Sequence, residues 1–278
     1  MDKANINGVE LEYEVTGDGE PVLFISPVLA DGFAPLIAQP ALADAYQLIR
    51  YHKRGWVGST HTDGPVSVAE HAHDAAALLD HLGIAHAHVV GHSSGAAVGA
   101  QLAIDDLERV HTLTLLELSL LSVPSGKAFL EQATPVFECY ASGDHETAVA
   151  MFLSAASGMD WTDCSDLLEE RVAGMVAQSV KDADTFFGVE LPGLTQWQFG
   201  DAEAAQIRRP VLSILGGDTA PLWVEVAAVL RAALPYVEER TIAGVGHLLH
   251  LQDPAPVATA IADFLERNPI RAAASAIR

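Results

Sequence analysis

The chain has 278 residues, half of them hydrophobic, which is enough for one sizeable globular domain with an inserted subdomain. Its 37 acidic residues outnumber 15 basic ones and give a net charge of −22, which opposes binding to nucleic acid and anionic membranes, since both need Lys/Arg-rich surfaces. The N-terminus lacks the basic and apolar regions of a signal peptide, and no apolar run reaches the roughly 20 residues of a membrane span. We therefore expect a cytoplasmic protein with no nucleic-acid or membrane partner, and the composition allows a homodimer.

Strand-like and helix-like segments alternate along most of the chain. A helix is predicted to begin near Ser67, where Ser-x-x-Glu forms a capping box, and to end before Gly83. Three more helices are predicted: one over the second part of residues 87–103, one over 222–234 and one over 254–267. The predicted strands are 9–16, 22–26, 46–51, the start of 87–103, 111–118, 210–217 and 236–242. The last residues, 272–278, are expected to be a frayed end.

Residues 119–207 differ from the rest because they are mostly helical by pattern, with breaks at proline and glycine. Strands that alternate with helices imply right-handed βαβ units and a mainly parallel sheet. A helical block inserted late in such a sheet is expected to cover its carboxyl edge. The sequence therefore predicts an α/β fold with a core of residues 1–118 and 208–278 and a helical cap of residues 119–207.

The segment Gly91-His92-Ser93-Ser94-Gly95 matches G-x-S-x-G and lies between a predicted strand and a predicted helix. In such a turn the serine hydroxyl is exposed above the sheet, and the flanking glycines let the helix approach the strand closely. The N-terminus of the helix then offers backbone N–H groups to a developing oxyanion. The pattern predicts that Ser93 is a nucleophile and that Ser94 contributes its backbone N–H.

Three motifs together resemble the α/β-hydrolase superfamily over nearly the whole chain. They are RYHKRGWVGS (50–59), VVGHSSGA (89–96) and GVGHLLHLQDP (244–254). The resemblance implies the α/β-hydrolase fold and a catalytic triad in the chain order Ser, acid, His. It makes Ser93 the nucleophile and His247 the general base, and it places the rival His250 one turn past the catalytic position.

The acid of the triad has two candidates. Most family members place an aspartate three residues after the glycine that ends the seventh main strand, but that position is Thr219 here, and Asp218 comes one residue early. The alternative position in the family, at the end of the sixth strand, holds Glu117. We favour Glu117, with Asp218 as the alternative. A Glu at this position, a Thr in place of the usual Asp and the elbow G-x-S-S-G-A also resemble the zearalenone lactonases.

The family resemblance also points to an oxyanion hole and a pocket. The usual His-Gly after the third strand is replaced by a sequence without glycine, in which the backbone N–H of Val28 aligns with the first donor and that of Ser94 with the second. Leu29 is the next candidate for the first donor. Aromatic residues of the cap segment are candidates to line an apolar acyl or ring pocket, or else simply form its core: Trp161, Phe186, Phe187 and Trp197.

These residues predict a serine hydrolase that cleaves a small apolar carboxylic ester or lactone through an acyl-enzyme. Two alternatives stay open: a C–C or amide hydrolase with the same triad, and a receptor-like binding protein of this fold with little turnover. A dehalogenase or epoxide hydrolase is not expected, because both need an aspartate at the position of Ser93.

Neither the cysteines nor the histidines are spaced as a metal site. The two cysteines are far apart, so free thiols are expected. The 12 histidines include the close pairs His71/His73 and His86/His88, but no set of carboxylates or cysteines accompanies either pair. We therefore expect solvated histidines, no metal and no cofactor.

Overall fold

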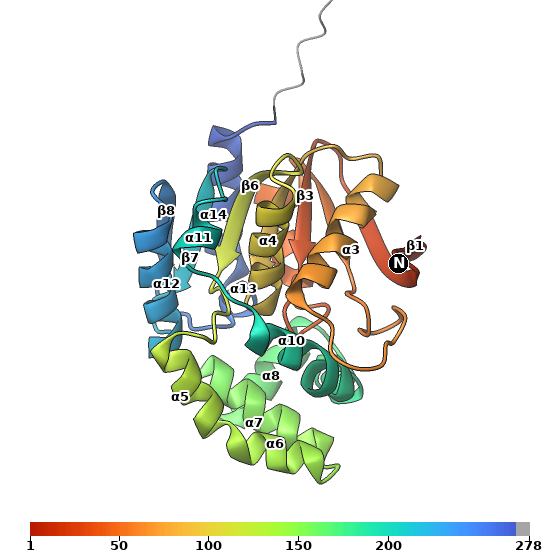
Figure 1. Ribbon diagram of the computed structural model, residues 1–278, viewed down its shortest axis with the longest axis vertical. Coiled ribbons are helices and arrows are strands. Elements are labelled where there is room, and N and C mark those ends of the chain that lie inside the picture. Colours follow the sequence, from red (N-terminus) through yellow and green to blue (C-terminus); the bar gives the residue numbers. More distant parts are fainter. Residues whose placement is uncertain (271–278) are drawn as a thin grey trace, which may run out of the picture.

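The computed structural model describes residues 1–270, so the expected frayed end at 272–278 lies outside the described residues. Its centre is an eight-stranded sheet in the order β1-β2-β4-β3-β5-β6-β7-β8 (Figure 1). The strands are β1 (Asp2–Ile6), β2 (Val9–Thr16), β3 (Glu20–Ile25), β4 (Tyr46–Tyr51), β5 (Ala87–His92), β6 (Val110–Leu116), β7 (Val211–Gly216) and β8 (Val237–Ile242).

The sheet is parallel from β4 to β8 and antiparallel only at one edge, where β1 pairs with β2 and β2 pairs with β4. The predicted strands all occur with their ends shifted by no more than two residues. The edge strand β1 was not predicted, because it is short and largely polar and forms a strand only by pairing with β2 in a hairpin.

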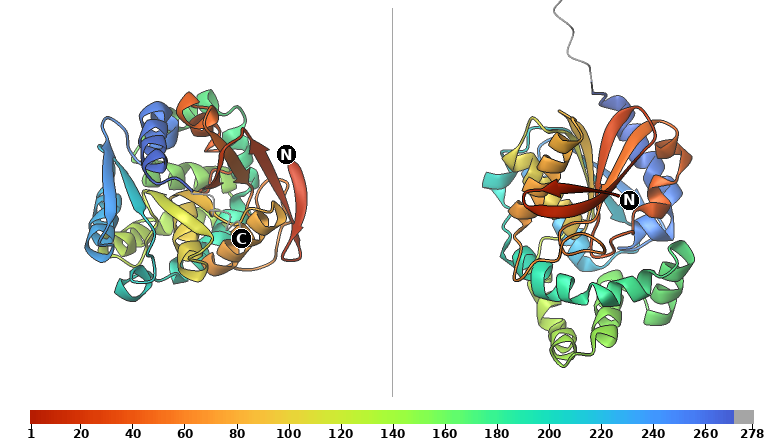
Figure 2. Two further views of the ribbon diagram at one scale, coloured as in Figure 1. Left: turned by 90° about the horizontal axis from the view of Figure 1, so that it is seen from above. Right: turned by 90° about the vertical axis from the view of Figure 1, so that its right-hand side faces the viewer.

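Two hydrophobic cores fill the two faces of the sheet, as a parallel sheet buried on both sides requires. Alternate residues of each strand enter different cores: Leu23 and Ile25 of β3 belong to one, and Val22 and Phe24 to the other. The first core also takes in α3 and α4, and the second takes in α1, α2 and α14, so the helices lie on both sides of the sheet (Figure 2).

The flanking helices carry their apolar residues at helical spacing. The predicted capping box is present at α3, where the Ser67 hydroxyl accepts a hydrogen bond from the Glu70 N–H and the Glu70 carboxylate accepts one from the Ser67 N–H. These helices are α1 (Ala34–Ile37), α2 (Pro40–Ala43), α3 (Val68–His81), α4 (Ser94–Asp105), α12 (Pro221–Ala233), α13 (Leu249–Gln252) and α14 (Pro254–Arg267).

Between β6 and β7 the chain is helical, and most of this segment gathers at the end of the sheet where β5 and β6 finish (Figure 1). It contains α5 (Pro124–Gln132), α6 (Thr134–Ala141), α7 (His145–Ser157), α8 (Trp161–Arg171), α9 (Met175–Lys181), the π-helix η1 (Thr185–Glu190), α10 (Leu191–Gln196) and α11 (Asp201–Ala204). Within residues 1–270, no helix has both the length and the apolar character to cross a bilayer.

The expectation of solvated histidines is wrong for His71 and His88. His71 is buried on the inner face of α3, and His88 is fully buried on β5. A central strand is covered on both faces, so a polar side chain on it must find its partners inside the protein. The His88 ring does so, with Nδ1 lying 2.8 Å from Thr112 Oγ1 and Nε2 lying 3.1 Å from Glu20 Oε2.

Candidate active site

Ser93 occupies a strained turn between β5 and α4. Its φ angle is +53°, in the left-handed region that side chains with a Cβ rarely adopt. The two glycines of the motif are needed for close approach, since a Cβ on Gly91 would collide with the Gly95 carbonyl and one on Gly95 with the Ile25 carbonyl. The turn therefore holds the Ser93 hydroxyl in a fixed position at the end of the strand.

The structure brings Ser93, His247 and Glu117 together, although the sequence separates them widely. His247 Nε2 lies 3.2 Å from Ser93 Oγ, and His247 Nδ1 lies 2.7 Å from Glu117 Oε2. An ionised carboxylate can only accept, so Nδ1–H donates to Glu117 and Nε2 is free to accept from the serine hydroxyl. All three side chains are buried. This geometry is that of a nucleophile, a general base and the acid that orients the base.

Glu117 directly follows β6, the neighbour of β5, and its two carboxylate oxygens have further donors. Oε1 accepts a hydrogen bond from the Gly216 N–H at 2.8 Å, and Oε2 accepts one from the Thr219 hydroxyl at 3.0 Å. The exposed Asp218 makes no hydrogen bond to His247, and its backbone N–H donates to the Val245 carbonyl at 2.9 Å. Thr219 thus occupies the usual position of the acid and supports Glu117 instead.

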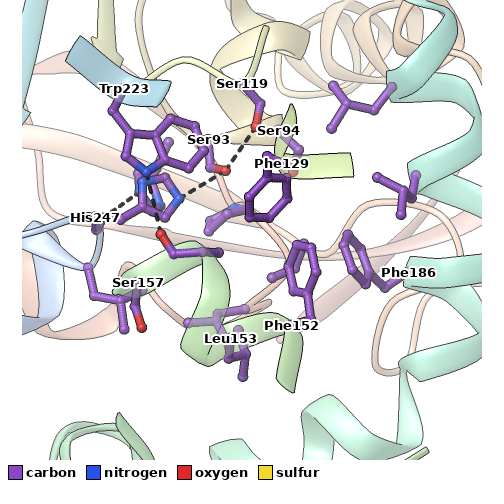
Figure 3. Close-up of a pocket in the computed structure, with 18 of the residues that line it drawn as sticks. Ser93, Ser94, Ser119, Phe129, Phe152, Leu153, Ser157, Phe186, Trp223 and His247 are labelled. Atoms are coloured by element: carbon purple, nitrogen blue, oxygen red, sulfur yellow. Dashed lines mark hydrogen bonds between the residues drawn. The ribbon is translucent and has the colours of Figure 1, made fainter. Parts of the chain in front are cut away.

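Two further residues at the triad were missed by sequence reasoning. The indole of Trp223, at the start of α12, stacks on His247 with ring centroids 3.8 Å apart and planes 4° apart (Figure 3). Such stacking fixes the plane of the imidazole ring. The Ser119 hydroxyl lies 3.3 Å from Ser93 Oγ. No local motif marks either residue, because each reaches the site only through packing.

His92 and His250 lie behind His247 and are completely or almost completely buried. His92 Nε2–H donates to the His247 carbonyl at 2.9 Å, and the His92 and His250 rings are 4.2 Å apart. Burial lowers the pKa of His92 well below its usual range and, with the charge of His247, lowers the pKa of His250 to about 3. His250, the rival base, is therefore a neutral packing residue that reaches neither Ser93 nor Glu117 by a hydrogen bond.

The neutral state of His250 predicts how stability depends on pH. Its pKa of about 3 in the folded protein lies below the ordinary value of 6.5, so the unfolded chain binds the extra proton first as the pH falls. The contribution of the neutral His250 ring to the free energy of unfolding is complete above pH 6.5 and is lost toward pH 3. Between pH 7 and pH 5, the free energy of unfolding should therefore fall by about 2 kcal/mol less in His250→Leu than in the wild type.

Urea unfolding at the two pH values measures this difference, with the exposed His73→Leu as the matched control. The control variant should keep the wild-type pH dependence. An unchanged pH dependence in His250→Leu would show that this ring is not a buried neutral group.

Val28 and Ser94, the two residues expected to supply backbone N–H groups to an oxyanion, both line the cavity above Ser93. Neither N–H donates a hydrogen bond to another group within residues 1–270. Leu29, the other candidate donor, also lines the cavity. Free N–H groups beside a nucleophile are the feature that an oxyanion hole requires.

The cavity above Ser93 is narrow, at about 40 Å³, and mainly apolar. Figure 3 shows Phe129, Phe152 and Phe186 around the space in front of Ser93. Among residues 1–270, no Asp, Glu, Lys or Arg side chain lines it. An apolar lining with a few polar groups at one end is typical of sites for small neutral ligands.

Of the four aromatic residues proposed for the pocket, only Phe186 lines the cavity with Ser93. Phe187 lines a smaller neighbouring cavity, and Trp161 lines neither. Trp197 turns away, because its Nε1–H donates to Gln101 Oε1 at 2.8 Å and its ring stacks on Phe199. Phe129 and Phe152 were missed, since helix packing in residues 119–207 decides which aromatic side chains face Ser93.

We expect activity to be independent of metal ions. No group of three or more His, Cys, Asp or Glu side chains within the described part of the chain could hold a metal ion. Turnover should therefore be unchanged after extensive dialysis against EDTA. Loss of activity that one particular divalent ion restores would contradict this expectation.

A sequence model of the family described as alpha/beta hydrolase fold matches residues 29–254. The chain belongs to this family. This α/β hydrolase is 29% identical over 258 residues to a Klebsiella pneumoniae (strain 342) protein provisionally named carbamate hydrolase RutD, an alignment that covers 89% of this chain and 92% of the relative. A protein of the same name from Azorhizobium caulinodans is 38% identical over 119 residues, which are 42% of this chain and 44% of that relative.

A third relative is the dihydrolipoyllysine-residue acetyltransferase component of the acetoin cleaving system of Cupriavidus necator, 29% identical over 252 residues. The alignment covers 90% of this α/β hydrolase but only 64% of that protein. The chain thus spans less than two thirds of both this relative and the one from A. caulinodans.

Solved structures share the fold. A thermophilic esterase from Thermogutta terrifontis superimposes with a TM-score of 0.79 at 20% identity, covering 96% of this chain and 98% of that one. Est816, described as an N-acyl homoserine lactone degrading enzyme, gives a TM-score of 0.75 at 24% identity, covering 95% and 100%.

Proposed function

We propose that this α/β hydrolase is a serine hydrolase that cleaves a small, neutral, apolar carboxylic ester or lactone through an acyl-enzyme. The observation that carries the proposal is the chain of contacts from Ser93 Oγ through His247 to Glu117, with distances of 3.2 and 2.7 Å, at the bottom of an apolar cavity. Ordinary ester hydrolysis needs a nucleophile, a base and an oxyanion hole, and each has a candidate here.

The reaction would run in two halves. Ser93 Oγ attacks the carbonyl carbon while its proton passes to His247 Nε2, and the N–H groups of Val28 and Ser94 stabilise the oxyanion. His247 then gives the proton to the leaving alkoxide, which departs as the alcohol and leaves the acyl group on Ser93. In the second half, water loses a proton to His247 and attacks the acyl-enzyme, which releases the acid and restores the serine.

The lining of the cavity supports the choice of substrate. Binding a charged substrate there would remove its charge from water with no ion pair in return, which is costly. The apolar side chains instead gain from covering a hydrocarbon chain or ring. A lactone is a cyclic ester and needs no other catalytic group, so the resemblance to the zearalenone lactonases is compatible with the same site.

A panel of substrates tests this function. The panel holds aryl esters of increasing acyl length, a macrocyclic lactone, an aryl carbamate and an anilide, each assayed with wild type and with Ser93→Ala. We expect multiple turnovers on the neutral esters or the lactone. Preferred cleavage of the carbamate or the anilide would contradict the ester assignment, and a single slow burst would favour a receptor-like binding protein.

A further inference from the structure

A second serine hydroxyl lies beside the nucleophile and takes no part in the two halves of the proposed reaction. Ser119 is 5% exposed and lines the cavity, and its Oγ lies 3.3 Å from Ser93 Oγ (Figure 3). Within residues 1–270, the Ser119 hydroxyl has no other hydrogen-bond partner. Buried hydroxyls are as a rule hydrogen-bonded, so the Ser93 hydroxyl is the group that satisfies Ser119 here.

The backbone fixes Ser119 against the turn that carries the nucleophile. The Ser119 N–H donates to the Ser93 carbonyl at 3.1 Å, and the Ser93 N–H donates to the Leu116 carbonyl at 3.0 Å. Between these two points lies Glu117, whose own N–H donates to the Ile214 carbonyl at 3.1 Å. The short segment after β6 therefore carries both the proposed acid and the Ser119 hydroxyl, and its backbone sets where Ser119 lies relative to Ser93.

The direction of the hydrogen bond between the two hydroxyls follows from His247. Its Nδ1–H donates to Glu117, so its Nε2 is the acceptor for the single proton of Ser93. A hydroxyl can donate one hydrogen bond and still accept another. When the Ser93 proton points to His247, Ser93 Oγ can only accept from Ser119. The Ser119 O–H is then the donor.

We propose that Ser119 is a positioning residue for the nucleophile: its O–H donates to Ser93 Oγ and holds that atom in the rotamer from which it attacks. This inference rests on the proposed function of Ser93. A serine side chain has three staggered rotamers, and a single contact of 3.2 Å with His247 restrains it only weakly. A second hydrogen bond favours the one rotamer in which both contacts are made, so that Oγ is already in place when a substrate enters.

The test uses a matched pair of variants, Ser119→Thr and Ser119→Val. Threonine and valine share the same branched shape and differ in the hydroxyl, so the pair separates hydrogen bonding from packing. The main readout is the rate at which a fluorophosphonate labels Ser93, which requires no knowledge of the substrate. Ser119→Val should label on the order of 10-fold more slowly than wild type, and Ser119→Thr should keep most of the wild-type rate. Ser119→Ala, which removes the hydroxyl without adding bulk, should lose as much as Ser119→Val.

A good ester substrate and a control variant complete the experiment. Ser119→Val and Ser119→Ala should lower kcat with little change in KM, because the hydrogen bond positions the nucleophile and not the substrate. Ser157→Ala is the control. Ser157, on α7, is also a buried serine in the lining of the cavity, but its Oγ accepts from the Met159 N–H at 3.2 Å and makes no described hydrogen bond to Ser93. This variant should label at nearly the wild-type rate.

Equal labelling rates in Ser119→Thr and Ser119→Val, or a wild-type rate in Ser119→Ala, would overturn the inference and leave Ser119 a packing residue. Faster labelling in Ser119→Ala would also overturn it, because Ser93 would then donate to Ser119 and be held away from His247. If circular dichroism shows that a branched variant does not fold, Ser119→Ala decides. If wild type is not labelled at Ser93 at all, the proposed function itself fails, and the inference fails with it.

Discussion

Glu117→Gln is expected to lower kcat by on the order of 10⁴, whereas Asp218→Asn should change it by less than about threefold. The amide of glutamine cannot stabilise the imidazolium that forms on His247, and it can hold the ring in the wrong tautomer. The 2.7 Å contact between His247 Nδ1 and Glu117 Oε2 carries this expectation. Asp218 is exposed and makes no such contact, so its charge is screened by water.

The measurement is kcat/KM for both variants on one good ester, with circular dichroism and thermal unfolding to show that each is folded. Thr219→Val is a useful third variant, because it removes only the 3.0 Å hydrogen bond to Glu117 Oε2 and should cost less than Glu117→Gln. If Asp218→Asn were the inactive variant, the loop after Gly216 would have to present Asp218 to His247 during turnover, and the assignment of Glu117 would be wrong.

Ser93→Ala should lower kcat by on the order of 10³ or more and leave the protein folded. The substitution removes only the hydroxyl, at a position where φ is +53° and the tight turn, not the side chain, determines the backbone. Residual catalysis would come from binding and from the N–H groups of Val28 and Ser94.

A fluorophosphonate probe should label wild type once, at Ser93, and should fail to label Ser93→Ala. Ser119→Ala is the matched control, because this hydroxyl lies 3.3 Å from Ser93 Oγ and is a rival nucleophile. That variant should still be labelled at Ser93. Mass spectrometry of the labelled peptide distinguishes the two serines, and label on Ser119 would overturn the assignment of the nucleophile.

The fold class and two residues of the candidate site could be predicted from the sequence, because the pattern behind each prediction lies in short segments of the chain. Alternation of strands and helices, with buried inner strands, predicts the parallel sheet, and the glycines beside Ser93 predict a turn that only glycine permits. His247 was predicted from the resemblance of residues 244–254 to a motif of the α/β-hydrolase superfamily. Only the neighbourhood of each residue was needed for these predictions.

Other features depend on contacts between segments that are distant in the sequence, so only the folded structure shows them. Glu117 and Asp218 could both be proposed from the sequence, and the register of β6 beside β7, with Thr219 donating to Glu117, separates them. The aromatic wall of the cavity depends on how short helices pack in residues 119–207, where periodicity is too weak to show which side chains face Ser93. The burial of His250 carries no sequence signal, since a histidine becomes a buried neutral group only when distant segments pack around it.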